Sequence, residues 1–257
     1  IWNARHPIIN EYDITLAQKS SALDSLKAVM VSDTHLGWIN RQAQLDGMVQ
    51  RINALNPDIV FMAGDILDEG IDPSFSQSII SSLSNIKAPL GIYAVLGNHE
   101  YISGQQVQFS SFLGQAGIHV LRDEWIMLDR SLYIIGRDDA SSSRFWLSGN
   151  RRKNVDDLTA EIDAAQLPVI LLDHQPVELV STGNTAVDLQ FSGHTHRGQL
   201  FPNNLITAKL FAQDWGYYKQ NSFQAIVSCG YGTWGPLLRI GSPSEIVVAN
   251  IKFSPEQ

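Results

Sequence analysis

Hydrophobic and polar positions alternate along the chain in blocks, and each block is typical of one kind of secondary structure. In residues 42–54, Leu45, Met48, Val49 and Ile52 recur at the spacing of one helical face. Short apolar runs rich in β-branched residues, typical of buried strands, follow such amphipathic stretches. Predicted helices cover residues 42–54, 74–86, 106–116 and 156–165. Predicted strands cover residues 58–64, 90–97, 118–121, 125–128, 131–136, 168–174, 187–192, 197–201, 224–229 and 245–252.

The order of these elements indicates the fold class. Strand–helix–strand units repeat through much of the chain, which implies a mixed sheet covered by helices. From residue 187 onward the pattern is mostly strand, which suggests a second sheet packed on the first. We therefore expect an α/β fold: a four-layer α/β/β/α sandwich of two mixed sheets flanked by helices. No linker rich in Pro, Gly or Ser divides the chain, so residues 1–257 are expected to form one domain, with residues 1–12 as an N-terminal extension.

Composition narrows the class of protein. A hydrophobic fraction of 44% and a charged fraction of 17% are ordinary for a globular domain. The net charge of −8, without a dense Lys/Arg run, argues against nucleic-acid binding, which needs a basic surface. The single cysteine, Cys229, excludes an internal disulfide and a thiolate metal cluster. No apolar run approaches the ~20 residues that cross a bilayer. Because the chain begins at Ile1 rather than Met, we expect a processed or excised fragment, with any signal or anchor upstream of it.

Polar side chains with metal-binding chemistry follow five of the apolar runs. The runs lead into Asp33 and His35, into Asp65, into Asn98 and His99, into His174, and into His194 and His196. The carboxyl ends of strands are where open α/β sheets bind ligands. Gly64, Gly97 and Gly193 precede three of these side chains, where a tight turn off the strand needs a residue without Cβ. His6 and His119 fall outside the pattern and are expected to be ordinary surface or core residues.

This donor set favours divalent cations. Carboxylate, imidazole and amide oxygen together suit manganese, iron or zinc, and the lack of thiolate disfavours a purely structural zinc site. Six to eight such ligands exceed one tetrahedral shell and predict two metals, about 3.5–4 Å apart. A lone His-x-His is equally typical of a polar turn at a strand end, so the prediction depends on the joint occurrence of the motifs.

The motifs together resemble those of a known family. The segments are DTH at 33–35, GDILD at 64–68, GNHE at 97–100, His174, and GHTH at 193–196. They resemble the motif set of the calcineurin-like metallophosphoesterases. The opening PIINEYDITL and the tail VSCGYGTWGPLLRIGSPSEIVVANI look like a bacterial, often membrane-anchored subgroup that includes relatives of UDP-2,3-diacylglucosamine pyrophosphatase.

The resemblance implies a role for each position. One metal would be held by Asp33, His35 and His196, and the other by Asn98, His174 and His194, with Asp65 bridging both. His99 would lie near the phosphate as a catalytic residue, with Asp68 orienting its ring. Asn98 and Arg197 would contact the substrate. Asp65 suits the bridge because a carboxylate has two oxygens and can serve two cations.

Two positions depart from patterns seen in the family. Glu69 stands in GDILDEG where protein Ser/Thr phosphatases carry Arg, which counts against a phosphoprotein phosphatase. Arg197 replaces the first Gly of GHTHGGQ, as many members of the subgroup have it. Its guanidinium could line the rim of the pocket and bind an anionic substrate, or it could be a solvated arginine at a strand edge.

The expected function is a dimetal-dependent phosphohydrolase. It would cleave a phosphodiester or pyrophosphate bond by attack of a metal-bridging hydroxide, on a lipid-linked or nucleotide substrate, with His99 giving a proton to the leaving group. A phosphomonoesterase is the alternative among enzymes, although only Arg197 is an obvious partner for a dianionic phosphate. A non-catalytic metal-binding scaffold is disfavoured because every motif position is filled. No obligate protein partner is implied.

Two aromatic clusters offer candidate contacts with the substrate or a membrane. In loop 141–153, Phe145, Trp146 and Leu147 lie between basic residues, a pattern that fits contact with anionic lipid headgroups. The alternative is a surface loop whose aromatic rings fold back on the core. Asp138 and Asp139 precede this loop and could hold it by hydrogen bonds or cap a helix. The second cluster, with either pocket-wall or core packing as its role, consists of Trp215, Tyr217, Tyr218 and Tyr101.

Overall fold

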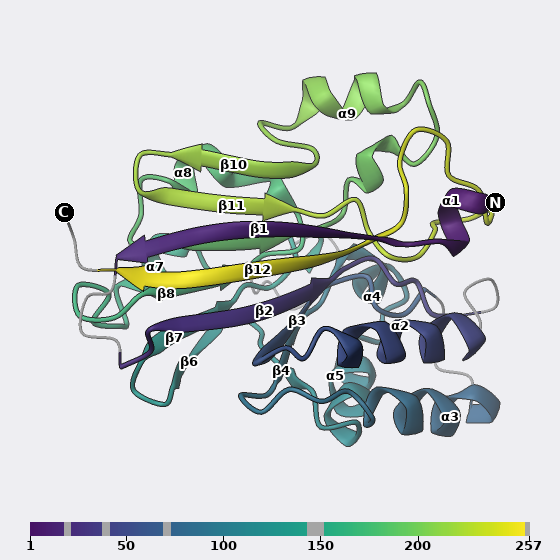
Figure 1. Cartoon of the computed structure of the whole chain (residues 1–257), viewed down its shortest axis with the longest axis horizontal. Helices are drawn as coiled ribbons and strands as arrows, with labels where there is room; N and C mark the ends of the chain where they lie inside the picture. The colour runs from purple at the N-terminus through teal and green to yellow at the C-terminus, as the bar shows by residue number, and fades with distance from the viewer. Residues whose placement is uncertain (18–21, 38–41, 69–72, 143–151, 255–257) are drawn as a thin grey trace.

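Two six-stranded sheets pack face to face in the computed structural model, which describes residues 1–17, 22–37, 42–68, 73–142 and 152–254 (Figure 1). The first sheet contains, in spatial order, β1 (Ile8–Ala17), β12 (Glu245–Ser254), β2 (Ser25–Val31), β3 (Ile59–Ala63), β4 (Ile92–Val95) and β5 (His119–Val120). The second sheet contains β10 (Gly216–Gln220), β11 (Phe223–Val227), β9 (Leu189–Ser192), β8 (Val169–Leu172), β7 (Leu132–Gly136) and β6 (Glu124–Leu128). Both sheets are mixed, as predicted. β2 to β5 run parallel, as do β7, β8, β9 and β11, and antiparallel pairs join β12 to β2, β10 to β11 and β6 to β7.

Helices cover the outer face of each sheet, which completes the predicted four layers. The first sheet is covered by α2 (Gln42–Ala54), α3 (Pro73–Leu83) and α5 (Gln106–Gln115). The second sheet is covered by α7 (Val155–Thr159) and α8 (Leu179–Thr182). The remaining short elements are α1 (Trp2–Arg5), α4 (Asn98–Ile102), η1 (Pro176–Glu178), η2 (His196–Gly198) and α9 (Asn204–Leu210). The four apolar residues predicted to share one face of α2 are all buried against the first sheet.

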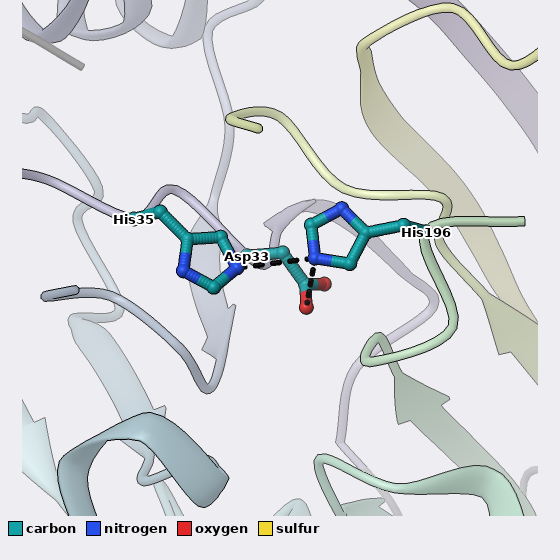
Figure 2. A group of neighbouring side chains, drawn as sticks. All are labelled: Asp33, His35 and His196. Atoms are coloured by element: carbon teal, nitrogen blue, oxygen red, sulfur yellow. Dashed lines mark hydrogen bonds and ion pairs between the residues drawn. The ribbon is translucent and has the colours of Figure 1, made fainter. Parts of the chain in front are cut away.

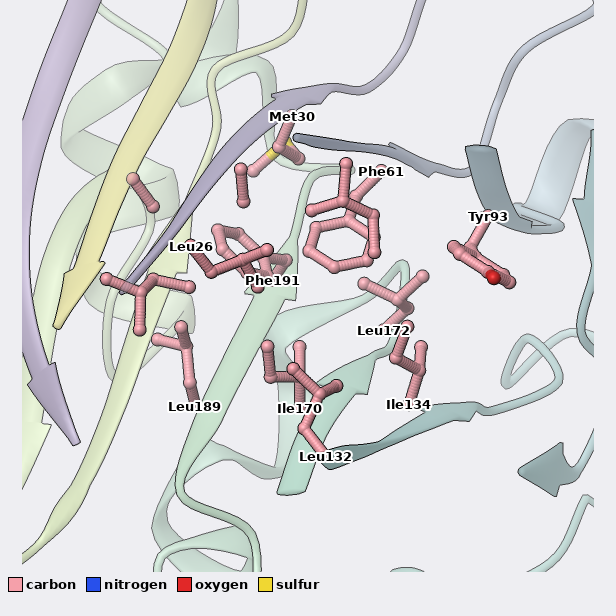
Figure 3. Packing of buried hydrophobic residues seen from close by; sticks show 14 of the residues in the cluster. Leu26, Met30, Phe61, Tyr93, Leu132, Ile134, Ile170, Leu172, Leu189 and Phe191 are labelled. Atoms are coloured by element: carbon pink, nitrogen blue, oxygen red, sulfur yellow. The ribbon is translucent and has the colours of Figure 1, made fainter. Parts of the chain in front are cut away.

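The main core fills the space between the two sheets. Phe61 of β3 and Phe191 of β9 have ring centroids 5.2 Å apart across this space (Figure 3). Leu26 and Met30 contribute from the first sheet, and Ile170 from the second. Each fully buried side chain of this kind stabilises the fold by about 1.5–3 kcal/mol. This packing fixes how the strand ends of the two sheets face each other, and the strand ends carry the candidate ligands.

Most elements lie where the hydrophobic pattern predicted them, but the strand predicted over 197–201 is wrong. The chain forms the 3-10 turn η2 there, and Arg197 and Gln199 have φ values of 49° and 53°, which no extended strand has. The helix predicted over 156–165 is also shorter than expected, because α7 ends at Thr159.

Besides short helical turns such as α4 and α8, the elements that were not predicted include β1, β10 and α9. β1 includes residues 8–12 of the expected N-terminal extension and pairs in parallel with β12. It lies at the sheet edge with only Ile14 and Leu16 buried, so its sequence lacks the apolar run of a central strand. β10 is likewise an edge strand, and α9 has no buried residue, so neither shows the pattern of a core element.

Candidate metal centre

The residues that follow β2, β3, β4, β8 and β9 converge on one end of the sandwich, and all seven predicted metal ligands lie there. The first group consists of Asp33, His35 and His196, and the second of Asp65, His174 and His194, each with its ligand atoms within 4.8 Å of one another. Asn98 joins the second group through its side-chain oxygen. His6 and His119 are exposed and are not part of either group.

The first group forms a compact donor set (Figure 2). His35 Nε2 lies 3.1 Å from His196 Nε2, which in turn lies 3.4 Å from Asp33 Oδ1. Asp33 is fully buried, and its carboxylate accepts a hydrogen bond from the backbone N–H of His194 at 3.0 Å. This bond ties the loop after β9 to the loop after β2, so the two sheets hold the group jointly.

Asp65 links the first group to the second. Its Oδ2 atom lies 3.2 Å from His174 Nε2 and 3.9 Å from His35 Nε2. Asn98 Oδ1 lies 3.3 Å from His174 Nε2 and 2.8 Å from His194 Nδ1. The Asp65 carboxylate therefore faces both groups, and its bridging role stays a prediction.

The chemistry of these donors fits divalent cations. His174 Nδ1 donates to the carbonyl oxygen of Ala63 at 2.7 Å, so in a neutral ring the Nε2 lone pair faces the oxygens of Asp65 and Asn98. Burial lowers the pKa of His174, but the charge of Asp65 outweighs it and raises the pKa well above its ordinary value. A positive charge is thus favoured where His174 Nε2 meets the side-chain oxygens of Asp65 and Asn98. A metal ion at this point can bind all three atoms at once.

His35 is oriented in the same way, by Asp68. Its Nδ1 atom lies 3.0 Å from Asp68 Oδ1, which leaves Nε2 to face the first group. His99 Nδ1 lies 3.0 Å from the same carboxylate oxygen. Burial lowers the pKa of His99, but the hydrogen bond to Asp68 and the nearby carboxylate charges raise it overall. Asp68 therefore holds one predicted ligand and the predicted catalytic histidine in fixed orientations.

Glu100 has a role that the sequence analysis did not assign. Its fully buried carboxylate accepts hydrogen bonds from the backbone N–H groups of Asp65, Ile66, Leu67 and Gly97, at 2.7–3.2 Å. Burial and the charge of Asp65 raise the pKa of Glu100 to about 7. Glu100 thereby holds the turn after β3, which presents Asp65. The sequence signal was its position three residues after Gly97, which is typical of a helix capping box.

Two of the three glycines before ligands are required for a reason other than a tight turn. Gly64 has φ +83°, as predicted. Gly97 and Gly193 do not have positive φ, but a Cβ at residue 97 would lie 2.5 Å from the backbone nitrogen of Asp65. A Cβ at residue 193 would lie 2.5 Å from Ser32 Oγ. These glycines let the strand ends approach closely enough to bring the ligands together.

Arg239 is a second residue that the sequence analysis missed. Its side chain is 2% exposed and donates to the carbonyl oxygens of Gly230 and Gly232. Its Nη2 atom also lies 3.1 Å from His196 Nδ1. Burial, and then the charge of Arg239, lower the pKa of His196 well below its ordinary value, so the imidazole stays neutral as a ligand must be. The tail that contains Arg239 carried a subgroup resemblance but no role for this residue, so only the folded chain shows the contact.

A cavity of about 790 Å³ opens over the two groups. Its described lining includes Asp65, Asn98, His99 and His194. Arg197 is not part of that lining, because its guanidinium lies 4.1 Å from the ring centroid of Trp215, and its role in substrate binding stays a prediction.

Of the two roles left open for the aromatic cluster, the described cavity lining does not support the pocket wall. The Trp215 ring lies against the guanidinium of Arg197, and the buried Tyr101 hydrogen-bonds to Asp138. The hydroxyl groups of Tyr217 and Tyr218 hydrogen-bond to glutamine side chains. None of these four aromatic residues is among the described residues that line the cavity. The aromatic residue in that lining is Trp234.

The expected lipid-contacting loop lies largely outside the described residues, since residues 143–151 are among those that the structure does not describe. At its end, Arg152 is ion-paired with Asp173 at 3.2 Å, and at its start Asp139 accepts hydrogen bonds from Gln175 and from the backbone of Ser141. Asp138 pairs with Arg122 at 3.2 Å.

Comparison with known proteins agrees with this geometry. The family model described as calcineurin-like phosphoesterase matches residues 26–198. The chain is 36% identical to an uncharacterized metallophosphoesterase of Aquifex aeolicus, over 88% of this chain and 85% of that protein. It is 33% identical to an uncharacterized metallophosphoesterase of Helicobacter pylori over 86% of this chain, and 27% identical to a transmembrane protein with metallophosphoesterase domain of Bos taurus over 98%. The chain spans only 58% and 59% of the length of these last two relatives. Among solved structures, the NAD nucleotidase of Haemophilus influenzae shares the fold, with a TM-score of 0.53 and 16% identity over 81% of this chain and 46% of that one.

Proposed function

Since the chain belongs to the calcineurin-like phosphoesterase family and is a metal-dependent phosphoesterase, we propose that it cleaves a phosphodiester or pyrophosphate bond with two divalent cations. The observation that carries this proposal is the position of Asp65, whose carboxylate faces both donor groups at the floor of an open cavity. Asp33, His35 and His196 would hold one cation, and Asn98, His174 and His194 the other, with manganese, iron or zinc suited to these donors.

Two cations, when bound, supply charge neutralisation at the phosphoryl oxygens and activate a water molecule for attack on phosphorus. The protein contributes the orientation of the donors, because Asp68 and the Ala63 carbonyl fix the rings of His35 and His174. Asn98 offers a neutral oxygen, which limits the negative charge of the site and lets an anionic phosphate approach.

His99 supplies the proton for the leaving group. It lies in the lining of the cavity, and its hydrogen bond to Asp68 raises its pKa, so the ring keeps its proton to a higher pH than an ordinary histidine does. General acid help of this kind is typically worth about 10²–10⁴-fold in rate.

The lining favours a diester or pyrophosphate over a monoester. A terminal phosphate dianion is usually met by arginine or lysine, and none of the described residues that line the cavity is either of these. A non-catalytic scaffold has no use for a histidine and an aspartate placed as His99 and Asp68 are. The substrate is a phosphate-containing small molecule or lipid.

We further propose that residues 1–257 form one domain that a segment upstream of this chain attaches to a membrane. Relatives named transmembrane proteins with a metallophosphoesterase domain support this. Within the described part of this chain, no helix is both long and apolar enough to cross a bilayer.

A panel of substrates on metal-loaded protein tests the function. We expect bis-p-nitrophenyl phosphate or a nucleotide-sugar pyrophosphate to be hydrolysed faster than p-nitrophenyl phosphate, with manganese, iron and zinc compared as cofactors. Asp65→Asn should lose activity and bound metal by elemental analysis, whereas the exposed control Asp163→Asn should keep both. Faster hydrolysis of the monoester, or full metal content in Asp65→Asn, would contradict the proposal.

A further inference from the structure

One wall of the metal cavity is apolar. The floor carries ligands such as Asp65 and Asn98, and beside them the cavity is lined by Ile102, Ile206 and Trp234. These three side chains are 57–59% exposed, so they face solvent and are not part of the core. Ile102 belongs to α4, Ile206 to α9, and Trp234 to the segment before β12. Three separate parts of the chain therefore contribute to this wall of the cavity.

The apolar surface continues beyond the cavity along α9. Figure 1 shows α9 above β10, away from both sheets. Its Leu205 and Leu210 are 56% and 73% exposed, and no residue of the helix is buried. Phe201, just before α9, is 59% exposed, and its backbone N–H bonds to the carbonyl oxygen of Ile240 at 2.9 Å. Several exposed apolar residues on and next to one short helix, one of them in the cavity lining, mark a binding site more often than chance.

Charge argues in the same direction. The other side chains of the described lining near this wall are neutral: Thr195, Gln199, Asn203 and Thr207. Apart from the metal ions and His99, the described lining therefore offers no cation to a carboxylate or another charged group of the substrate. An uncharged apolar group can instead bury its surface against Ile102, Ile206 and Trp234.

We propose that this wall binds an alkyl or aryl group of the substrate, so that the substrate class is an amphiphilic phosphodiester whose apolar part lies along α9. The proposal rests on the proposed function, because it places the phosphate of the same molecule at the two metal ions. It assigns the apolar residues of α9 to the substrate itself, since Ile206 of this helix lines the cavity that holds the candidate ligands.

A series of p-nitrophenyl alkyl phosphodiesters, with alkyl groups from ethyl to hexyl, tests the proposal. Each ester is used at concentrations at which it stays monomeric. A fully buried methylene group is worth about fourfold in binding, so about twofold is expected on a wall that is open on one side. We therefore expect kcat/KM to rise at least tenfold from the ethyl to the hexyl ester. Titration calorimetry with ethylphosphonate and hexylphosphonate should give a similar ratio of dissociation constants, independent of turnover.

Ile206→Ser and Trp234→Ser should each reduce the hexyl-to-ethyl ratio at least threefold. Val180→Ser is the matched control, because Val180 is a 56% exposed helical aliphatic residue outside the cavity lining, and it should keep the ratio. The proposed apolar binding site would be refuted by a hexyl-to-ethyl ratio near one in the parent protein or by an unchanged ratio in both wall variants. It would also be refuted by a rise in kcat/KM that appears only when lipid vesicles are present. If no ester is hydrolysed, the proposed function is wrong. The ratio of dissociation constants for hexylphosphonate and ethylphosphonate then still shows whether the apolar wall binds an alkyl group.

Discussion

Replacing Gly97 by alanine should disable the metal centre although it removes no ligand. The new Cβ would lie 2.5 Å from the backbone nitrogen of Asp65 and 2.8 Å from its Cγ, and closer still to Oδ1. Real Cβ atoms essentially never approach other atoms within 3.0 Å, so Gly97 and the Asp65 carboxylate must separate by about 0.5–1 Å. The neighbouring backbone cannot yield freely, because Glu100 and His99 hold both sides of this contact.

The size of the effect follows from that displacement. A misplacement of about 1 Å in a catalytic site costs about 10²-fold in rate, and overpacking costs about 1–3 kcal/mol of stability. We expect Gly97→Ala to lose at least 50-fold in kcat/KM on bis-p-nitrophenyl phosphate. Elemental analysis should find less than two bound metal ions per chain.

A matched control separates this effect from the general cost of changing a glycine. Gly47 lies in the interior of α2, and a Cβ added there would meet nothing within 4 Å, so Gly47→Ala should raise the unfolding free energy by about 0.5–1 kcal/mol and leave activity unchanged. Urea denaturation of both variants measures stability. Full metal content and activity within threefold of the parent in Gly97→Ala would refute the reasoning.

Three further variants test individual side chains. His99→Asn should lose about 10²–10⁴-fold in rate on diesters with poor leaving groups and far less on p-nitrophenyl esters. Because the raised pKa keeps the His99 acid protonated to higher pH, the rate of the parent protein should fall as pH rises through that pKa. This fall in rate should be absent from the pH profile of the variant. Glu100→Ala leaves four buried N–H groups without their acceptor and should lower the unfolding free energy by about 2–4 kcal/mol in urea titrations, which an unchanged midpoint would exclude. Arg239→Met should weaken one of the two metals in chelator competition, because it releases the ring of His196, whereas Arg239→Lys should restore part of the affinity; equal loss of both metals would contradict this assignment.

The sequence predicted that the candidate ligands converge because each lies within a few residues of the end of a buried strand. Asp33, Asp65 and His174 follow runs whose apolar character is local and strong, and parallel pairing brings the carboxyl ends of the strands in each sheet to one edge of that sheet. Edge strands such as β1 are half-solvated, so their pattern is weak. Arg239 could not be predicted, since its contact with His196 depends on the path of a long loop. The apolar residues of α9 were not assigned to any element from the sequence, and only the folded chain shows that they are exposed on one helix.

Backbone conformation, more than side-chain packing, defines this centre. Five of the seven candidate ligands have positive φ: Asp33 at 51°, His35 at 43°, Asp65 at 49°, His194 at 72° and His196 at 48°. Such conformations cost of order 1–3 kcal/mol each unless the surroundings hold them, although aspartate and histidine tolerate them better than most residues. Hydrogen bonds between the loops hold them here: Asp33 N–H donates to the Gly64 carbonyl at 2.9 Å, and His35 N–H to the Asp65 carbonyl at 3.0 Å. Transfer of the seven candidate ligand residues alone to another parallel sheet should therefore give no dinuclear site, because the loops would relax without Gly97 and Glu100.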